Sequence, residues 1–443
     1  MKDNTMSSTD QKLVFSRSFS RKEQKIFGCG ALVGCLIVAV TFSTVFKSYL
    51  HPISDHFEVE TTIYPSIRNW SDSRSDVYEI TGDVRFDGRS FTIFADYAID
   101  NNASEWTVKP YARKFDEFAM SKVSSLTVKH VMSSHKDSNR NNDETPIKMP
   151  NCDRMSRVWT PVVVFSTGGF SSNYFHAFTD VLLPLYSTSI RFGRDVLLVT
   201  LDGPLSWAHK YKKILDRLSK YDVISIPKSE NHDRAFCFSR VVVGLRAERE
   251  FTANERSTPE FARLVRSAYS LKRGVVYSKS SPRSRMLIVC RRKGRRLVNR
   301  VEVVRVAQGL GFDVVMREMG DDMAEVARLV NGFDVMVAVH GAGLTNMVFL
   351  PRGAIVVQVV PYGLQWVARK CFEGFARSMK LWYLAYEAGL NESSLAVSGE
   401  NPDVVRRKGW GAFKALYLDG QDLRVDLVRF RGTLMKAWEL LHV

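Results

Sequence analysis

Three stretches of the sequence hold side chains whose types and spacing could do chemistry. The first is Thr167–Pro184, TGGFSSNYFHAFTDVLLP, in which His176 and Asp180 lie four residues apart. If this stretch is helical, the two side chains share one face of the helix. A histidine beside a carboxylate can act as a general base, and the same pair also occurs in protein cores as a purely structural contact. The residues alone leave both interpretations open.

The second stretch is Val339–Asn346, VHGAGLTN, which directly follows the apolar run Asp334–Val339. Its two glycines would let backbone N–H groups approach a ligand closely. Its histidine can donate to a phosphate or a sugar, and its threonine and asparagine can cap a following helix whose N-terminus favours an anion. The competing interpretation is a tight strand-to-helix turn that needs glycine for its backbone alone.

The third stretch is Lys272–Arg300, which holds 11 Lys or Arg residues and no acidic residue. Its densest part, RRKGRR (Arg291–Arg296), follows the apolar run RMLIVC (Arg285–Cys290). Guanidinium groups at the end of a strand suit a diphosphate. The other two interpretations are a solvated surface run and a nucleic-acid or nuclear-import patch.

The elements that must position these residues follow a β–α rhythm. Short continuous apolar strands that alternate with helices indicate a parallel sheet covered on both faces, with ligands at the carboxyl ends of its strands. The first series predicts strands and helices, in chain order, at Pro161–Ser166, Tyr174–Ile190, Asp195–Leu201, Trp207–Leu218 and Val241–Leu245. The second predicts them at Arg285–Cys290, Val301–Leu310, Asp313–Met316, Asp322–Val330, Asp334–Val339 and Ala354–Val360. Two such series predict two doubly wound, Rossmann-like lobes.

The N-terminus contains a predicted membrane span. Ile26–Phe46 is a 21-residue run without charge, and at 1.5 Å per residue it is roughly as long as a bilayer core is thick, about 30 Å. Six basic residues precede it, so the positive-inside rule leaves the N-terminus in the cytosol. The alternative is a cleaved signal peptide, but both the apolar run and the 25-residue lead before it are too long for one.

The whole chain has 443 residues and a formal charge of +16, which favours anionic partners such as nucleotide sugars, acidic polysaccharides, acidic membranes or nucleic acid. The membrane span argues against nucleic acid, as does the lack of any zinc-finger, helix-turn-helix or RNP pattern. The predicted organisation is a cytoplasmic tail (1–25), a transmembrane signal anchor (26–46), a lumenal stem (47–76), an N-terminal lobe (77–273), a C-terminal lobe (274–395) and a C-terminal segment that packs back on the lobes (396–443).

Two further patterns fit a lumenal body. Asn69, Asn102 and Asn391 each begin an Asn-X-Ser sequon, and we predict them as glycosylation sites. Outside the membrane span an even number of cysteines remains, which allows one or two disulfides or buried free thiols. We expect Cys290, at the end of an apolar run, to be the one that stays free; the full set is Cys152, Cys237, Cys290 and Cys371.

At the level of whole motifs the sequence resembles the plant family 61 glycosyltransferases, and in particular their grass-expanded clade of xylan arabinosyl- and xylosyltransferases. The resemblance covers nearly the whole chain in the same order. It rests on SRSFSRKEQKIFGCGALVGC (Ser16–Cys35), VKPYARKFD (Val108–Asp116), GGFSSNYFHAFTDVLLPLY (Gly168–Tyr186), CFSRVVVGL (Cys237–Leu245) and VHGAGLTNMVFLPRGAIVVQVVP (Val339–Pro361).

This resemblance implies a GT-B-like fold, a Golgi address and an inverting transfer of a pentose, arabinofuranose or xylose, from a UDP-pentose to xylan. It places the acceptor on the N-terminal lobe and the UDP-sugar on the C-terminal lobe. No cofactor or divalent metal is expected, because enzymes of this fold usually stabilise the leaving diphosphate with side chains and a helix N-terminus. The implied donor-binding residues are Arg291, Arg292, His340, Gly341, Ala342, Gly343, Leu344, Thr345 and Asn346.

One departure from the family pattern concerns the catalytic base that inversion requires. The family often has an acidic residue directly after the motif histidine, where this chain has Ala177. The candidate catalytic residues inside the motif are therefore His176 and Asp180. The departure also keeps open a rival function, a catalytically inactive scaffold of the same fold that binds polysaccharide or UDP.

Overall fold

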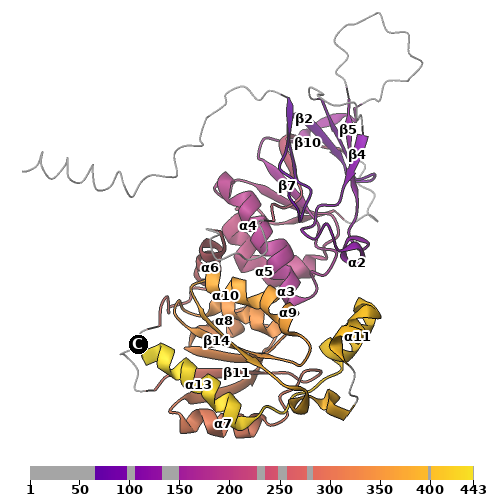
Figure 1. The fold of residues 1–443 in the computed structure, drawn as a ribbon. Helices are drawn as coiled ribbons and strands as arrows, with labels where there is room; N and C mark the ends of the chain where they lie inside the picture. The colour runs from indigo at the N-terminus through magenta and orange to yellow at the C-terminus, as the bar shows by residue number, and fades with distance from the viewer. Residues whose placement is uncertain are drawn as a thin grey trace, which may run out of the picture. The chain divides into compact units, whose positions relative to one another are not determined.

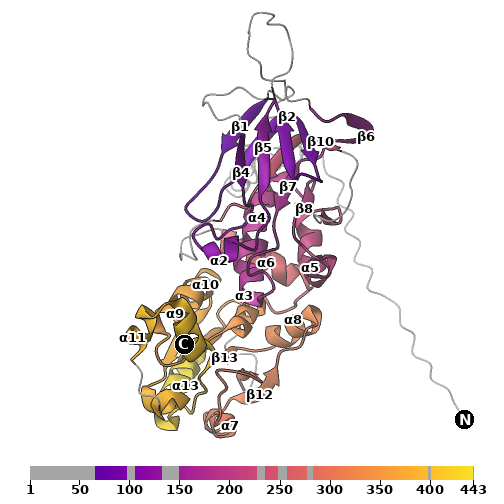
Figure 2. The ribbon, with the colours of Figure 1, turned by 90° about the vertical axis from the view of Figure 1, so that its right-hand side faces the viewer.

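The computed structural model of this chain (Figures 1 and 2) describes residues 65–96, 105–131, 149–226, 235–247, 257–276, 283–397 and 401–442. The predicted tail, membrane span and most of the stem lie outside these ranges, and so does Asn102. Within the ranges, no helix is both long and apolar enough to cross a bilayer.

The N-terminal lobe contains a mixed sheet, with ten strands among the described residues. The order is β4-β5-β3-β2-β10-β7-β8-β9, with β1 paired to β2 and β6 paired to β10. The strands are β1 (Ser66–Asn69), β2 (Tyr78–Asp87), β3 (Thr92–Ala95), β4 (Glu105–Val108), β5 (Leu126–His130), β6 (Cys152–Val158), β7 (Val162–Phe165), β8 (Leu197–Thr200), β9 (Ile224–Ser225) and β10 (Ala235–Val243).

This lobe corrects the prediction of a doubly wound parallel sheet. β10, β7, β8 and β9 are parallel neighbours, but β2 pairs antiparallel with β10. The two parts differ in sequence pattern: β7 is buried at all four positions, whereas β2 alternates buried and partly exposed side chains over much of its length. Continuous apolar runs are typical of parallel strands covered on both faces, and alternation is typical of antiparallel strands with one face solvated. The lobe also begins before Val77, because β1 belongs to its sheet.

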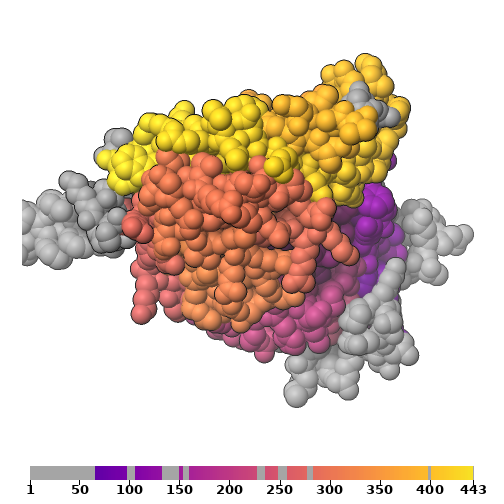
Figure 3. Space-filling model, turned by 90° about the horizontal axis from the view of Figure 1, so that it is seen from below, coloured from indigo at the N-terminus to yellow at the C-terminus, as the bar shows by residue number. Residues whose placement is uncertain are grey.

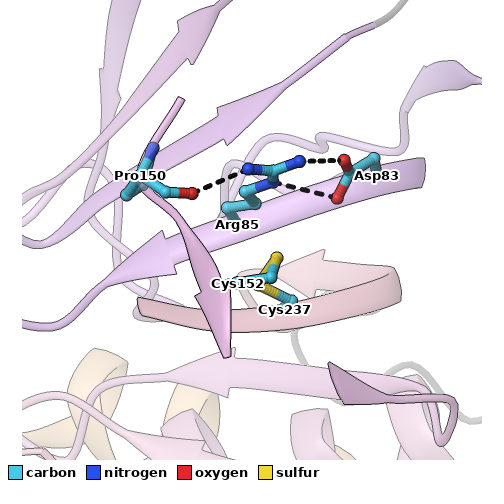
Figure 4. The surroundings of a disulfide bond; sticks show 5 residues. All are labelled: Asp83, Arg85, Pro150, Cys152 and Cys237. Carbon is cyan, nitrogen blue, oxygen red and sulfur yellow. Dashed lines mark hydrogen bonds and ion pairs between the residues drawn. A yellow bond between two sulfur atoms is a disulfide. The ribbon is translucent and has the colours of Figure 1, made fainter. Parts of the chain in front are cut away.

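A disulfide bond joins Cys152 of β6 to Cys237 of β10 (Figure 4), with 6.0 Å between the Cα atoms. It crosses a place where the pairing of β6 with β10 shifts its register. Arg85 of β2 donates to the carbonyl of Pro150, just before β6, and so holds the start of this edge strand as well. The prediction that Cys290 is free is confirmed, and Cys371 is also not in a disulfide.

The C-terminal lobe contains a sheet of five parallel strands in the order β12-β11-β13-β14-β15. Numbered along the chain, this is the order 2-1-3-4-5 of doubly wound sheets, whose connections change direction between the first and third strands. That switch point lies between β11 and β13. The strands are β11 (Arg285–Cys290), β12 (Asp313–Glu318), β13 (Val335–Val339), β14 (Ile355–Val360) and β15 (Trp382–Glu387).

Helices cover both faces of this sheet. One apolar cluster joins alternate strand residues such as Met286 and Val337 to helices α7 (Arg300–Gly309) and α13 (Leu427–His442). The other joins the opposite strand face to α8 (Met323–Asn331), η3 (Ala342–Phe349), η4 (Arg369–Glu373) and α10 (Gly374–Ser378). This second cluster also takes in the N-terminal lobe's helices, which are α3 (Tyr174–His176), η1 (Ala177–Leu182), α4 (Leu183–Ser189), α5 (Leu205–Leu218) and α6 (Ser257–Ala268). The short helix α9 (Gln365–Ala368) contributes Ala368 to a smaller apolar cluster with Phe413 and Tyr417 of the C-terminal segment.

The C-terminal segment lies against the C-terminal lobe (Figure 3), where the chain end coloured yellow covers the residues coloured orange. It contains α11 (Pro402–Arg407), α12 (Trp410–Phe413), the π-helical turn η7 (Lys414–Asp419) and α13. α13 packs on α7 and β15 through Phe430, Leu434 and Leu441, which are buried. The remaining short elements are α2 (Glu117–Met120), η2 (Ile190–Phe192), η5 (Leu390–Glu392) and η6 (Ser394–Val397).

Candidate active site

His176 and Asp180 meet on one helix, as their spacing predicts. The helix begins at α3, after the eight-residue loop that leaves the carboxyl end of β7. It widens to a π-helical turn at η1, where Leu183 donates to the carbonyl of Phe178 five residues earlier. Pro184 explains this turn, because a proline inside an α-helix has no N–H to donate and its ring clashes with the carbonyl four residues before it. That carbonyl belongs to Asp180, and π-helical turns of this kind are frequent at functional sites.

Asp180 is fully buried and accepts from donors on three segments of the chain. The Nδ1 of His176 lies 2.7 Å from one carboxylate oxygen, and the hydroxyl of Tyr111 lies 3.2 Å from the same oxygen. Thr179 and Arg74 donate to the other oxygen at 3.0 and 3.2 Å, and Arg113 adds an ion pair at 3.6 Å. A buried carboxylate with so many donors is stable as an anion.

The electrostatics divide the roles of the two candidate catalytic residues. Burial by itself would raise the pKa of Asp180, but the hydrogen bond and charge of His176 and the charges of Arg113 and Arg74 together hold that pKa below its usual value. An ionised carboxylate only accepts, so the proton on the imidazole lies on Nδ1 and a neutral ring has its lone pair on Nε2. The His176 side chain is 20% exposed and Asp180 is not exposed at all. Of the two side chains, only His176 is therefore accessible from solvent, and Asp180 lies buried behind it.

A second charged centre lies at the switch point of the C-terminal lobe. Arg291 and Arg295 follow β11, and Gly341 follows β13. A Cβ atom added at Gly341 would lie 2.4 Å from Nη1 of Arg291 and 3.5 Å from Nη1 of Arg295, so both guanidinium groups converge on this glycine. Gly341 also has φ near +149°, which other residues rarely adopt. The first glycine of the VHGAG motif, Gly341, is thus required both by the space that the two arginine side chains occupy and by its own backbone conformation.

The positive charge of this centre is only partly compensated. Burial and the charge of Arg291 lower the pKa of Arg295 to about 10, and Asp419 is the carboxylate that partly opposes this. Among the described residues, the buried Nε of Arg295 has no hydrogen-bond partner. Two close guanidinium groups, one of which has an unpartnered N–H, suit a diphosphate, because a diphosphate accepts several such hydrogen bonds.

Of the two predicted arginines, the structure brings only Arg291 to this centre. Arg292 is 84% exposed and pairs with Glu318 of β12 at 2.5 Å. Arg295, which sequence reasoning missed, takes the place beside Arg291. The available signal was Gly294: it and Arg295 both have φ near +55°, so a glycine-containing turn folds the chain back and returns Arg295 to the strand end.

His340 is buried at the end of β13 in a fixed protonation state. The side-chain amide of Gln358 donates to its Nδ1 at 2.8 Å, and the hydroxyl of Tyr383 donates to the amide oxygen at 2.9 Å. Burial, followed by the charges of Arg295 and Arg291, lowers the pKa of His340 to about 3. The ring is therefore neutral at physiological pH, with its proton on Nε2 as a hydrogen-bond donor.

The rest of the predicted donor loop adopts a different local structure from the one expected. Ala342–Phe349 is a 3-10 helix, so Thr345 and Asn346 lie within it and do not cap a following helix. Asn346 donates to the carbonyl of Gly343, and the buried Thr345 hydroxyl has no partner among the described residues. Leu344 is buried in the apolar cluster that both lobes share, so its packing anchors this loop to the core.

Two phenylalanine rings connect the histidines of the two lobes. Phe372 lies 5.5 Å from the His340 ring and 5.0 Å from Phe175, and Phe175 lies 5.2 Å from the His176 ring. Each distance joins ring centroids and falls in the range of favourable aromatic packing. The dyad and the arginine centre therefore belong to one region of the molecule.

Of the other predicted sites, Asn69 and Asn391 are exposed, as glycosylation requires. In the part of the chain that the structure describes, no group of three or more His, Cys, Asp or Glu side chains is placed to hold a metal ion.

The fold and the two centres define an α/β protein with a pair of arginines at a switch point and a histidine–carboxylate pair in the same region. Residues 174–357, which hold both centres, match the model of the family described as Glycosyltransferase 61. The alpha-1,3-arabinosyltransferase XAT3 of Oryza sativa subsp. japonica is 37% identical over 396 residues, covering 84% of this chain and 65% of that protein.

Two further relatives are covered over most of their length. The beta-1,2-xylosyltransferase XYXT1 of Oryza sativa subsp. japonica is 32% identical over 413 residues, covering 85% of each chain. The xylan glycosyltransferase MUCI21 of Arabidopsis thaliana is 30% identical over 398 residues, covering 82% of this chain and 77% of that protein. This chain belongs to the glycosyltransferase 61 family, which confirms the resemblance of its motifs. It spans slightly less than two thirds of two alpha-1,3-arabinosyltransferases of Oryza sativa subsp. japonica, 65% of XAT3 and 64% of XAT2.

The buried neutral His340 predicts a specific pH dependence of stability. Its folded pKa of about 3 lies below the usual 6.5, so acid protonates the unfolded chain first. The stabilisation is complete above pH 6.5 and is lost as pH falls toward 3. Between pH 7 and pH 5 the free energy of unfolding should fall by about 2 kcal/mol. Urea unfolding at pH 7 and pH 5 should show this loss in the wild type and not in His340→Asn.

His209→Gln, at an exposed helical position, is the control and should keep the wild-type loss. An unchanged pH dependence in His340→Asn would contradict the assignment.

Proposed function

We propose that this protein is an inverting pentosyltransferase of cell-wall synthesis that moves arabinofuranose or xylose from a UDP-pentose to xylan. The carrying observation is the pairing of a histidine–carboxylate dyad with a two-arginine centre inside the residues that match the family model. The printed names of the relatives, an arabinosyltransferase, a xylosyltransferase and a xylan glycosyltransferase, support the substrate class.

The proposed reaction uses each centre once. Nε2 of His176 takes the proton of an acceptor hydroxyl while that oxygen attacks the anomeric carbon of the donor. A new C–O bond forms with inversion as the bond between the anomeric carbon and the diphosphate oxygen breaks, and UDP leaves with the electron pair. Asp180 holds the imidazole in the correct tautomer and stabilises the imidazolium that forms.

Arg291, Arg295 and the Nε2–H of His340 would stabilise the diphosphate as its charge grows. Preorganised donors of this kind lower the barrier because they need not reorient during the reaction. We propose that these side chains take the part that a divalent metal has in other transferases, so that no metal or other cofactor is required. In the same proposal the fold is GT-B-like, with the acceptor on the N-terminal lobe and the UDP-sugar on the C-terminal lobe.

The dyad is tested by turnover measured per folded molecule. His176→Ala should lower transfer from UDP-arabinofuranose or UDP-xylose to xylo-oligosaccharides by about 10²–10⁴, because it removes the base, while UDP affinity stays the same. Asp180→Asn should also lower turnover, with a loss of stability because Arg74 and Arg113 lose their counter-charge. Mass spectrometry of the products and calorimetry with UDP supply the two readouts.

His209→Ala is the matched control for these variants. Near-normal turnover of His176→Ala would place the base elsewhere. Transfer and donor hydrolysis both absent from the wild type, with UDP still bound, would favour the inactive scaffold. Because the pKa of Asp180 is held low, an acid limb of the rate profile above pH 5 cannot arise from that carboxylate.

The two-arginine centre makes a prediction that separates neighbouring residues. Arg291→Ala and Arg295→Ala should each weaken UDP binding about tenfold to a hundredfold, since a charge-assisted contact contributes roughly 1.5–3 kcal/mol. Arg292→Ala removes the same charge from the same loop but from a side chain that faces Glu318, and it should change UDP affinity less than threefold. Calorimetry with the full-length proteins decides between them. A larger effect from Arg292→Ala than from Arg295→Ala would show that the donor lies on the other side of the loop.

We further propose that the protein is a single-pass type II membrane protein of the Golgi with its catalytic lobes in the lumen. The disulfide between Cys152 and Cys237 supports this address, because disulfides persist in oxidising compartments. In sealed microsomes, protease should remove an N-terminal tag, and the protected body should carry an N-glycan that Asn391→Gln reduces. Protection of the N-terminal tag would contradict the orientation.

A further inference from the structure

The N-terminal lobe displays a cluster of exposed aromatic rings next to His176. Phe115 lies just before the short helix α2 (labelled in Figures 1 and 2) and is 75% exposed, and Phe118 lies within α2 and is 64% exposed. The Phe118 ring lies 5.9 Å from Phe170, and Phe170 lies 5.0 Å from the His176 ring, both between centroids. We call Phe115, Phe118, Phe170 and Lys122 the α2 surface. Within it, ring contacts lead from the exposed Phe118 through Phe170 to His176, and the exposed Phe115 lies three residues before Phe118.

The Gly-Gly pair of the sequence motif is what seats Phe170 in this surface. A Cβ atom at Gly168 would lie 2.5 Å from the carbonyl oxygen of Lys122, and one at Gly169 would lie 2.7 Å from the ring of Tyr111. Gly169 also has φ near +59°, a conformation that favours glycine. The backbone N–H of Phe170 then donates to the hydroxyl of Tyr111 at 3.2 Å. The two glycines therefore allow the loop after β7 to pack against the α2 region.

The α2 surface combines these rings with positive charge. The ammonium of Lys122 lies 4.3 Å from the centroid of Phe118 and 5.7 Å from that of Phe170, and the guanidinium of Arg113 lies 5.5 Å from Phe170. Arg113 is engaged by Asp116 and Asp180, whereas Lys122 is exposed over the rings. A cation held over exposed rings can exchange this contact for a carboxylate when a ligand arrives.

We infer that the α2 surface binds the polysaccharide acceptor and selects chains that carry uronic acid. This inference rests on the proposed function, because an acceptor hydroxyl at Nε2 of His176 obliges the neighbouring sugars to cross the adjoining surface. The C–H faces of pyranose rings are weakly apolar and can stack on Phe115 and Phe118, and Lys122 can pair with a uronate carboxylate. Neighbouring exposed aromatic rings beside a candidate catalytic residue are typical of a binding surface. Charge complementarity favours an acidic chain over a neutral one.

The first experiment measures binding of the full-length protein to two polymers, glucuronoxylan and neutral arabinoxylan, by affinity electrophoresis. The double variant Phe115→Ala and Phe118→Ala should bind both polymers on the order of tenfold more weakly, because two stacking rings are lost. Lys122→Gln should weaken binding to glucuronoxylan alone and should reduce its dependence on salt. Equal effects of Lys122→Gln on both polymers would overturn the uronate contact.

Two matched controls come from the opposite edge of the same sheet. Trp159 is 72% exposed and precedes β7, so it lies at the amino end of the strand whose carboxyl end leads to Phe170. Lys220 pairs with Asp195 before β8, also at the amino edge. Trp159→Ala and Lys220→Gln remove a comparable ring and charge and should leave both affinities unchanged. Losses equal to those of the α2 variants would show a nonspecific effect and overturn the proposal.

The second experiment separates this inference from the proposed function. The aromatic double variant should raise KM for polymeric xylan and leave both kcat and transfer to xylobiose near wild type. Binding of polymer by the wild type without transfer from any UDP-pentose would refute the proposed function and leave the surface standing. Normal KM for polymer in the variant, or equal losses with xylobiose and a lower Tm, would overturn the surface while the function stands. The surface would also be overturned if the wild type formed a dimer that dissociates in the variant while the affinity for polymer stays unchanged.

Discussion

The N-terminal lobe depends on the burial of one carboxylate, that of Asp180. Removing an ion from water costs several kcal/mol, so a buried charge is tolerated only when its partners are close and well oriented. Here the partners come from separate segments: Arg74 before β2, Tyr111 and Arg113 before α2, and His176 on the same helix. Satisfying this one group therefore fixes the segment between β1 and β2, the loop that leads to α2 and the orientation of the imidazole together.

The C-terminal lobe is built on the opposite electrostatic arrangement. Arg291 and Arg295 bring positive charge together where burial lowers the pKa of both, and His340 beside them stays neutral. A neutral histidine near two cations avoids a third like charge and still offers an N–H. One lobe thus holds a carboxylate whose hydrogen-bonding capacity is filled, and the other holds arginines whose positive charge is only partly compensated.

The C-terminal segment is part of the second centre and not only a cover for the sheet. The backbone N–H of Arg295 donates to the carbonyl of Gln421, and Arg296 makes charged hydrogen bonds to Asp422 at 2.6 and 2.9 Å. Gly294 approaches the carbonyl of Asp419 so closely that an added Cβ would lie 3.0 Å from it. The loop after β11 is therefore held from outside its own sheet, which gives its left-handed turn a defined position.

Local pattern by itself determined most elements of this protein, because apolar periodicity depends on near neighbours in the chain. The predicted strand Arg285–Cys290 is β11 to the residue, and the i, i+4 spacing of His176 and Asp180 correctly predicts their contact. The sequence also showed the family, through motifs long enough to be specific. Tertiary structure decided what depends on distant partners: the antiparallel pairing of β2 with β10, the disulfide chosen from four cysteines, and Asp180's place behind the histidine, set by Arg74 and Arg113. It likewise placed Arg295 instead of Arg292 beside His340, since a single turn at Gly294 reverses which guanidinium faces the strand end, and residue types do not record that reversal.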